Sequence, residues 1–153
     1  MQPAILFVCL GNICRSPLAE AAFRRAAQDA GLDVAVDSAG TGDWHVGHPP
    51  DRRAQAVALR YGIDISGLRA RQVEAADFTR FSHIFALDHD NLLAIEARAP
   101  ALCKAEIGLL LDVVPGRMGQ AVADPYYGAD SGFETTWAEV SEAAAALVAR
   151  FSR

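Results

Sequence analysis

The chain has 153 residues and a net charge of −5, and 52% of its residues are hydrophobic. This length fits one domain, residues 1–153, and the apolar content is enough for a core, which excludes extensive disorder. The acidic balance argues against a nucleic-acid binder with a broad basic surface, and no run reaches the ~18 apolar residues of a membrane-spanning helix.

Strands alternate with helices along the chain. The first apolar run, 4–8, is typical of a buried strand, and the helix after it has Pro17 in its first turn, where a missing N–H does no harm. Gly31 marks the end of that helix, and Ser131 with Glu134 three residues later has the spacing of an N-cap and capping box. The pattern predicts strands over 4–8, 34–38, 83–87 and 106–111, and helices over 17–30, 51–62, 74–78, 89–99 and 131–151.

This alternation predicts an α/β fold of three layers, in which helices cover both faces of a four-stranded parallel sheet. Ligands of such sheets bind beyond the carboxyl ends of the strands, near the point where the strand order reverses. Cys9 directly follows the first strand. It is therefore expected at the edge of the sheet where a ligand would bind.

The segment from Cys9 to Ser16 has the pattern C-x5-R-S and lies between the first strand and the first helix. Loop N–H groups and the positive end of the helix dipole converge there, which suits a phosphate or a similar oxyanion. The planar guanidinium of Arg15 can bind two phosphate oxygens, and Gly11 permits a close backbone approach and a positive φ. Asn12 can hold the shape of the loop through its side-chain amide.

The same electrostatic field favours a thiolate at Cys9, and Ser16 can donate a hydrogen bond to it. A cysteine after a strand is often only a small buried residue. The combination of strand, C-x5-R-S loop and helix nevertheless favours a nucleophile at this position.

Short segments with specific patterns are spread over nearly the whole chain. They are 8–17, 37–41, 43–47, 50–54, 70–72, 87–91 and 124–128. Together and in this order they resemble the conserved blocks of the low-molecular-weight protein tyrosine phosphatases. The resemblance implies a flavodoxin-like fold and the hydrolysis of phosphotyrosine in protein substrates through a cysteinyl-phosphate intermediate.

The resemblance also implies roles for single residues. Cys9 is the nucleophile, Arg15 binds the phosphate oxygens, and Asp124 in the D-P-Y-Y block is the general acid for the leaving phenolate. The loop residues that contact the phosphate are Leu10, Gly11, Asn12, Ile13, Cys14 and Ser16. Without the other blocks, Asp124 would be interpreted as part of an ordinary Asp-Pro turn.

Aromatic residues are implied around the site. Trp44, Tyr126 and Tyr127 form the walls of a slot for a flat phenyl ring, and the alternative for each is packing against the core. Asp88 is implied to orient Arg15, and its alternative role is to cap the following helix; the two roles are compatible.

Support for the loop is implied to include a hydrogen bond between Ser38 and Asn12. The chain departs from the family here, because many relatives have a histidine where Leu68 precedes Arg69. The network that supports the asparagine must then be shorter or use another partner. In the family, the cysteine at the position of Cys14 can form a reversible disulfide with the nucleophile; its alternative role is to fill space beneath the loop.

Two other functions fit parts of the pattern. A thiol-dependent arsenate reductase would use the same anion loop, but it needs resolving cysteines near 88–93, where the sequence has none. A non-catalytic phosphotyrosine-binding module would need neither a nucleophile nor an acid.

Composition sets expectations for partners and compartment. The start of the chain lacks the basic segment and long apolar run of a secretion signal, so we expect a cytoplasmic protein without nucleic-acid or membrane partners. The three cysteines are too few for a disulfide scaffold, and the histidines lack metal-binding spacing. We expect no metal and no other cofactor, only phosphotyrosine proteins and inorganic phosphate or a similar oxyanion in the loop.

Overall fold

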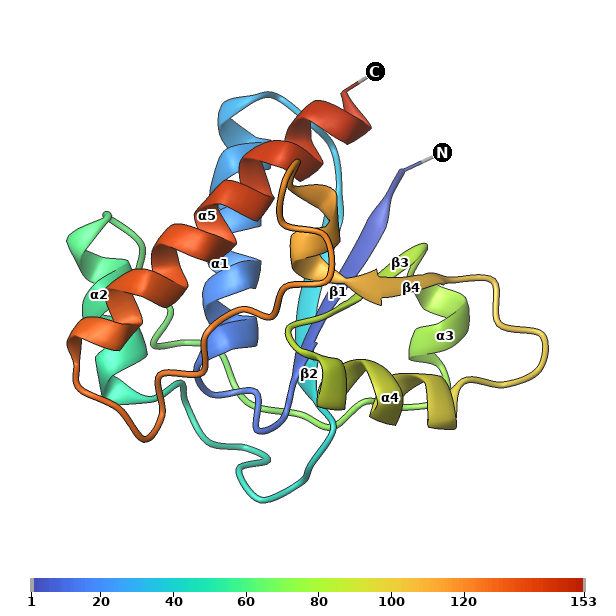
Figure 1. Ribbon diagram of the computed structural model, residues 1–153, viewed down its shortest axis with the longest axis horizontal. Helices are drawn as coiled ribbons and strands as arrows, with labels where there is room; N and C mark the ends of the chain where they lie inside the picture. The colour runs from blue at the N-terminus through green and yellow to red at the C-terminus, as the bar shows by residue number, and fades with distance from the viewer. Residues whose placement is uncertain (1, 153) are drawn as a thin grey trace.

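Four parallel strands form the centre of the computed structural model, which describes residues 2–152 (Figure 1). The strands are β1 (Ala4–Cys9), β2 (Ala35–Gly40), β3 (His83–Ala86) and β4 (Glu106–Leu109). The helices are α1 (Arg15–Asp29), α2 (Arg52–Arg60), α3 (Asp77–Arg80), α4 (His89–Arg98) and α5 (Ser131–Phe151), with a 3-10 turn, η1 (Leu110–Val113), after β4. The predicted domain, 1–153, also includes residues 1 and 153, which lie outside the described residues.

The strand order is β2-β1-β3-β4, and each neighbouring pair is parallel. The chain therefore moves from β1 to β2 on one side and later returns to place β3 on the other side of β1. Cys9, the last residue of β1, lies at this reversal of direction. The predicted fold class is confirmed, and the nucleophile candidate lies where such sheets bind ligands.

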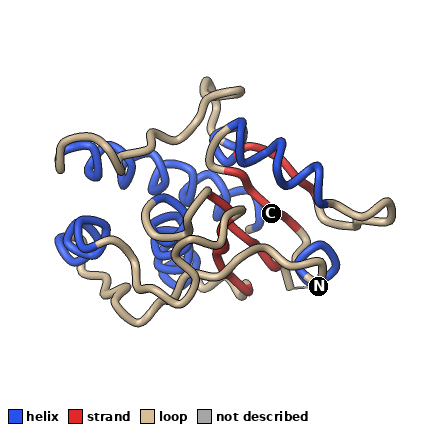
Figure 2. The backbone as a smooth tube through the Cα atoms, turned by 90° about the horizontal axis from the view of Figure 1, so that it is seen from below, coloured by secondary structure: helices blue, strands red, loops and turns tan. Residues whose placement is uncertain are grey.

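The side chains of β1 show how the sequence determines the layers. Ile5 and Phe7 belong to one core cluster, whereas Leu6 and Val8 belong to the other. This alternation follows from the two-residue period of a strand. Helices α1, α2 and α5 cover the first face, and α3 and α4 cover the second, as the view from below shows (Figure 2). Burial on both faces explains the continuous apolar run of β1.

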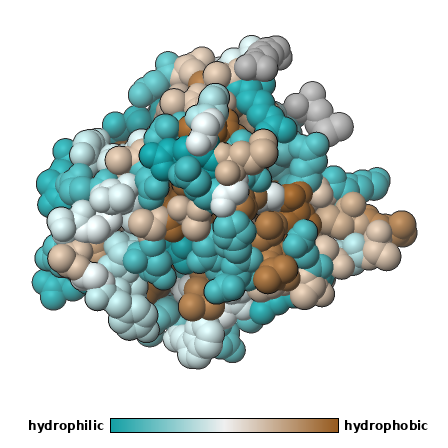
Figure 3. Space-filling view, viewed as in Figure 1, coloured by the Kyte–Doolittle hydropathy of each residue, from teal (hydrophilic) through white to brown (hydrophobic). Residues whose placement is uncertain are grey.

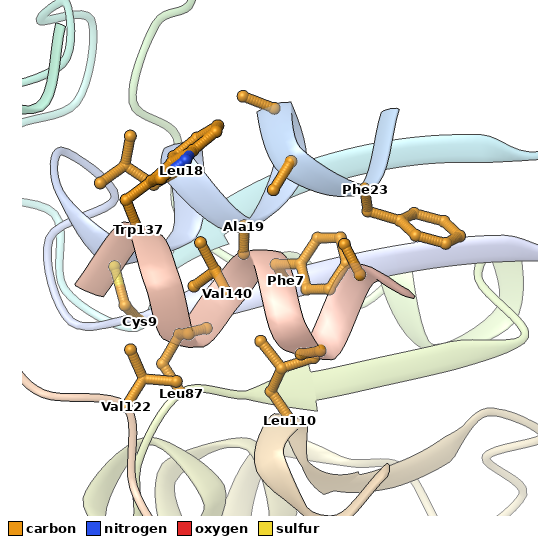
Figure 4. Close-up of a cluster of buried hydrophobic side chains, with 14 of the residues drawn as sticks. Phe7, Cys9, Leu18, Ala19, Phe23, Leu87, Leu110, Val122, Trp137 and Val140 are labelled. Carbon is orange, nitrogen blue, oxygen red and sulfur yellow. The ribbon is translucent and has the colours of Figure 1, made fainter. Parts of the chain in front are cut away.

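Helices α1 and α5 pack against each other over β1. Leu18 of α1 and Val140 of α5 belong to one cluster, and Cys9 lies at the end of it (Figure 4). Phe23 of α1 is fully buried, with its ring centroid 6.0 Å from that of Phe7. This packing fixes α1, and therefore the loop that leads into it.

The predicted capping box at the start of the last helix is wrong. Asp130 precedes α5 in a conformation that is already helical, Ser131 is the first helical residue, and the N-cap side chain makes no capping hydrogen bond. Glu134 instead accepts a hydrogen bond from the hydroxyl of Tyr61 and forms an ion pair with Arg60. The carboxylate therefore connects α5 to α2.

Some element boundaries also differ from the prediction. β4 is shorter than 106–111 because Leu110 and Leu111 turn inward into the cluster beneath α1 and α5, where both are fully buried. β2 continues to Gly40, which pairs in register with Cys9. Helix α1 already begins at Arg15, and α3 begins at Asp77, so it overlaps only the end of the predicted helix over 74–78.

The outer surface mixes polar and apolar residues. Hydrophilic residues cover much of the face formed by α5, and hydrophobic residues appear at the tip of the loop between α4 and β4, where Leu102 is exposed (Figure 3). Within residues 2–152, no helix combines the length and the apolar character that crossing a bilayer requires.

Replacement of Phe23 tests the packing between α1 and the sheet. Phe23→Ala is expected to lower the free energy of unfolding by about 3–5 kcal/mol, because a fully buried ring leaves a cavity. Urea denaturation followed by circular dichroism measures this loss. Leu93→Ala, at an exposed position of α4, is the control and should change the free energy by less than about 0.5 kcal/mol. Equal losses in the two variants would contradict this assignment of the core.

Candidate active site

A cleft of about 350 Å³ opens at the carboxyl end of β1. Its lining comes from the loop before α1, the segment after β2 and the segment before α5: Cys9, Leu10, Gly11, Ile13, Cys14, Arg15, Trp44, His45, Asp124, Tyr126 and Tyr127. Asn12 and Ser16 do not line the cleft and are buried behind it. His45 is the wall residue that the sequence analysis missed, although its position next to Trp44 in the block 43–47 was a usable signal.

The loop between β1 and α1 curls around the sulfur of Cys9. The N–H of Asn12 donates to Cys9 Sγ over 3.3 Å, and the hydroxyl of Ser16 lies 3.0 Å from the same atom. Asn12 has a φ of 58°, in the left-handed region that non-glycine residues rarely adopt. Gly11 permits a positive φ, but in this loop the positive φ falls on Asn12. Gly11 allows a close approach instead, because a Cβ there would stand 3.0 Å from the ring of His45, which would have to shift slightly.

The side chain of Asn12 is fully engaged in hydrogen bonds. Its Nδ2 donates to Ser16 Oγ over 2.7 Å and to Ser38 Oγ over 3.0 Å, so the expected bond to Ser38 is present. Its Oδ1 accepts from the backbone N–H of Arg71 over 3.0 Å. This N–H supplies a polar partner that Leu68 cannot; Leu68 lines a separate cavity of about 190 Å³ behind the loop. The network holds Asn12 in its strained conformation.

The guanidinium of Arg15 is buried and held by acceptors from distant parts of the chain. Its Nη1 contacts Asp88 Oδ2 at 2.9 Å and the carbonyl oxygen of Val122 at 3.1 Å. Its Nη2 lies 3.6 Å from Asp124 Oδ2. Asp88 also accepts from the N–H of Asn91 and so caps α4. Both contacts that we expected of Asp88 therefore occur together.

Asp124 combines a local turn with a contact in the cleft. Its Oδ1 accepts from the N–H of Tyr126 over 3.1 Å, which is the Asp-Pro turn of the alternative interpretation. Its other oxygen faces Arg15, and the side chain is 49% exposed. A carboxyl group that is both anchored and open to solvent can exchange a proton with a ligand in the cleft.

The three aromatic residues differ in how far they stand free of the core. Trp44 and Tyr127 are 68% and 93% exposed, so neither packs into the core. Tyr126 is half-buried, packs against the core and meets Tyr127 edge to face with the ring centroids 4.8 Å apart. The indole lies directly against Gly42, where a Cβ would stand 1.9 Å from the Trp44 ring and would force the ring to move. All three side chains line the cleft.

The start of α2 connects the loop between β1 and α1 to the segment that carries Asp124, which the sequence analysis did not foresee. Asp51 caps α2, and its N–H donates to the carbonyl of Ile13 over 2.8 Å. Arg53 donates to Asp51 Oδ2 and to the carbonyl of Tyr126, each over 3.0 Å. Its guanidinium also lies over the ring of Phe133, 4.7 Å from the centroid. Asp51 and Arg53 thus connect the start of α2 to Ile13 and Tyr126, which line the cleft on different segments.

The second loop cysteine is electrostatically unlike a nucleophile. Burial raises the pKa of the Cys14 thiol far above its ordinary value, and the negative charge of Asp51 raises it further. Cys14 therefore stays protonated. Cys9, Cys14 and Cys103 are all free thiols. Within residues 2–152, no group of three or more His, Cys, Asp and Glu side chains is arranged to hold a metal ion.

Comparisons with known proteins agree with this geometry. A sequence model described as "Low molecular weight phosphotyrosine protein phosphatase" matches residues 4–153. The low molecular weight phosphotyrosine protein phosphatase of Schizosaccharomyces pombe is 45% identical over 132 residues, which is 84% of this chain and 84% of that protein.

Solved structures superpose over almost the full length. A protein tyrosine phosphatase from Entamoeba histolytica, crystallised with Hepes in the active site, has a TM-score of 0.92 at 35% identity, over 99% of this chain and 97% of that chain. A drosophila arginine phosphatase has a TM-score of 0.92 at 32% identity, over 100% of this chain and 99% of that chain.

The link between Asp51 and Arg53 predicts a pH-dependent stability. Burial favours the neutral form of Asp51, but hydrogen bonds and charge from Arg53 outweigh it and lower the pKa of this carboxyl. Since the native pKa lies below the unfolded one, the carboxylate stabilises the fold above the unfolded pKa, and this stability is lost as the pH falls through the native pKa.

Asp51→Asn keeps a good N-cap and removes the charge, so it isolates this effect. We expect the variant to unfold more easily than wild type near neutral pH, and the difference to shrink as the pH falls below the native pKa of the carboxyl. Urea denaturation at a series of pH values measures both. A difference in free energy of unfolding that does not change with pH would show that the charge plays no part.

Proposed function

This chain belongs to the low-molecular-weight phosphotyrosine protein phosphatase family, and we propose that its cleft hydrolyses phosphotyrosine with Cys9 as nucleophile, Arg15 as phosphate ligand and Asp124 as general acid. Membership makes the chain a protein tyrosine phosphatase, a hydrolase whose substrates are phosphoproteins. The observation that carries the proposed roles is the position of the Cys9 sulfur at the floor of the cleft, with a backbone N–H and a hydroxyl directed at it.

The first step transfers the phosphoryl group to the enzyme. The Cys9 thiolate attacks phosphorus in line with the aryl oxygen, so an S–P bond forms as the P–O bond breaks. Asp124 gives its proton to the leaving phenolate. Arg15 and the N–H groups of loop residues 10–14 bind the non-bridging oxygens and stabilise the charge of the transition state.

The second step releases the phosphate. Asp124, now a carboxylate, accepts a proton from the attacking water, and the S–P bond breaks as the new P–O bond forms. The hydroxyl of Ser16, 3.0 Å from the sulfur, stabilises the departing thiolate. Inorganic phosphate leaves the loop. Arg15 and the loop N–H groups offset the negative charge of the phosphate, so the proposed steps require no metal ion.

The aromatic walls give the proposed preference for aryl phosphates. Trp44, Tyr126 and Tyr127 offer ring faces and edges to a phenyl group above the loop. A serine phosphate would have to bring its peptide backbone down to the level of these rings to reach Cys9. The depth and the aromatic lining of the cleft therefore support phosphotyrosine over phosphoserine.

The remaining expectations belong to the same proposal. We expect the loop to bind inorganic phosphate and similar oxyanions, and the sulfonate-bearing Hepes in the active site of the Entamoeba histolytica phosphatase supports this expectation. We also propose a single catalytic domain over 1–153 and a cytoplasmic location. Nucleic acids and membranes are not proposed as partners of this acidic chain.

The geometry gives less support to the two rival functions. Arsenate reduction needs resolving cysteines near 88–93, where the chain has none. Cys103 precedes β4 and so lies at the amino ends of the parallel strands, away from the cleft, and burial favours the protonated form of Cys14 in the loop. A module that only binds phosphotyrosine would not need the carboxyl of Asp124 beside Arg15, or the thiol of Cys9 in the cleft. A catalytic use of Cys9 and Asp124 accounts for their positions.

Variants of the proposed nucleophile and acid test the mechanism with a phosphotyrosine peptide. Cys9→Ser is expected to lose turnover completely, because an alkoxide does not form at this position near neutral pH. Asp124→Ala should lower kcat about 10²- to 10⁴-fold. Its loss should be smaller with para-nitrophenyl phosphate, whose leaving group needs less protonation.

Asp29→Ala, an exposed carboxylate at the end of α1, serves as the control and should retain wild-type rates. Full activity in Cys9→Ser would overturn the proposed nucleophile. Equal losses of Asp124→Ala with both substrates would move the acid elsewhere. Reduction of arsenate by the wild-type protein with thioredoxin would favour the rival reaction.

Trp44→Ala tests the aromatic slot. We expect KM for a phosphotyrosine peptide to rise about three- to tenfold, while the slow turnover of the matching phosphoserine peptide stays the same. Phosphoarginine completes the panel, because a structural neighbour is a drosophila arginine phosphatase. A higher kcat/KM for phosphoarginine than for phosphotyrosine would contradict the proposed substrate class.

A further inference from the structure

A buried carboxylate is connected to the Cys9 sulfur through the back of the phosphate loop. Glu20 lies within α1 and is only 3% exposed. Its Oε1 accepts from the hydroxyl of Ser38 over 2.7 Å, and its Oε2 accepts from the guanidinium of Arg24 over 2.7 Å. Burial of a charged group is costly, even in a pair, and the apolar contacts of α1 do not require it. The position of Glu20 therefore calls for a separate explanation.

The hydrogen bonds between Glu20 and the loop can run in only one direction. A carboxylate has no proton to give, so Ser38 donates its hydroxyl hydrogen to Glu20 and presents lone pairs to Asn12. Asn12 Nδ2 then donates to Ser38 over 3.0 Å and to Ser16 over 2.7 Å. The opposite orientation of the amide is excluded because Asn12 Oδ1 accepts from the N–H of Arg71.

The direction of these bonds determines what Ser16 can do. Since its oxygen accepts from Asn12, its single hydrogen is free to point elsewhere. Cys9 Sγ lies 3.0 Å away, whereas the carbonyl oxygen of Ala39 lies 3.5 Å away. The hydrogen of Ser16 therefore has the sulfur as its nearer acceptor.

We propose that Glu20 is a positioning residue that anchors this hydrogen-bond chain: Glu20 holds the Ser38 hydroxyl, Ser38 and the N–H of Arg71 hold the Asn12 amide, and the amide holds Ser16 where its hydroxyl donates to the Cys9 thiolate. The chain of groups is Glu20, Ser38, Asn12, Ser16 and Cys9, and we call it the Glu20 relay. Glu20 touches neither substrate nor sulfur and acts only through the groups between. The inference rests on the proposed role of Cys9 as nucleophile and identifies a further residue that supports it.

The charge of Glu20 and the relay have opposite effects on Cys9. A buried negative charge opposes a second one nearby, so loss of the charge alone would favour the thiolate. Loss of the relay would instead release Ser38 and loosen the Asn12 amide that holds Ser16 beside the sulfur, and it would disfavour the thiolate. The sign of the change therefore distinguishes the two.

The surroundings of Glu20 allow the substitution to be made. The cavity of about 190 Å³ behind the loop is bordered by Glu20, Ser38 and Asn12. Methionine has a similar length and a flexible side chain, so Glu20→Met can use this space without pushing the loop. Glu20→Gln removes the charge but keeps an oxygen that can accept from Ser38.

The experiment measures the pH dependence of Cys9 alkylation by iodoacetamide, with the modified cysteine identified by mass spectrometry. For Glu20→Met we expect the midpoint to rise by about one pH unit, the equivalent of one hydrogen bond to the thiolate. Glu20→Gln should stay closer to wild type. Ser38→Ala should reproduce the rise, and the double variant Glu20→Met/Ser38→Ala should show no more than the larger single effect.

Arg25→Gln, an exposed substitution on the same helix, is the matched control and should leave the midpoint unchanged. A midpoint that falls or does not move in Glu20→Met overturns the proposal, as does an additive double variant. If Glu20→Met does not fold, Ser38→Ala provides the test instead. An alkylation midpoint of Ser38→Ala equal to that of wild type would refute the relay.

Alkylation does not require turnover, so the two proposals can fail separately. A wild-type protein that is alkylated as expected but does not hydrolyse phosphotyrosine would contradict only the proposed function. An active enzyme whose alkylation midpoint does not change when Glu20 or Ser38 is replaced would contradict only the relay. For an active enzyme we expect kcat of Glu20→Met to fall with the thiolate fraction at low pH and to recover as the pH rises.

Discussion

The side-chain amide of Asn12 fixes the shape of the phosphate loop, and the rest of the site depends on that shape. Its left-handed backbone costs of order 1–3 kcal/mol and persists only where the surroundings enforce it. The amide provides that enforcement by joining three segments, since it binds Ser16 in α1, Ser38 in β2 and the backbone of Arg71. With the loop held in this way, the N–H of Asn12 donates to the sulfur of Cys9.

A second set of contacts assembles the groups that face the loop. Arg15 begins α1 and reaches Asp88 after β3 and the Val122 carbonyl before α5. Arg53 holds the carbonyl of Tyr126, so the segment of Asp124 is fixed from both sides. These contacts join residues far apart in sequence, and each places a charge or a dipole at the carboxyl edge of the sheet. Because all four strands run in the same direction, their carboxyl ends meet at this edge and bring these groups together.

Sequence patterns predicted the architecture well where one physical rule dominates. The buried run of β1, the order of strands and helices and the C-x5-R-S loop follow from local periodicity and spacing, and the structure has them. Predictions failed where local rules compete with tertiary contacts. Ser131 has the spacing of an N-cap, but Glu134 binds α2 instead. Gly11 permits a positive φ, but the strain falls on Asn12, whose amide has partners to hold it.

By itself, the sequence determined the α/β fold, the position of Cys9 at the end of the first strand and the C-x5-R-S pattern of the loop that follows. These features depend on neighbours within a few residues, and periodicity and motif spacing record such neighbours directly. Only the tertiary structure decided that Arg53, together with Asp51, connects the segment of Asp124 to the loop between β1 and α1. It also decided that Glu20 is connected to Cys9 through hydrogen bonds. Such hydrogen bonds join residues brought together by packing, and their direction depends on which group lacks a proton, which no spacing in one sequence records.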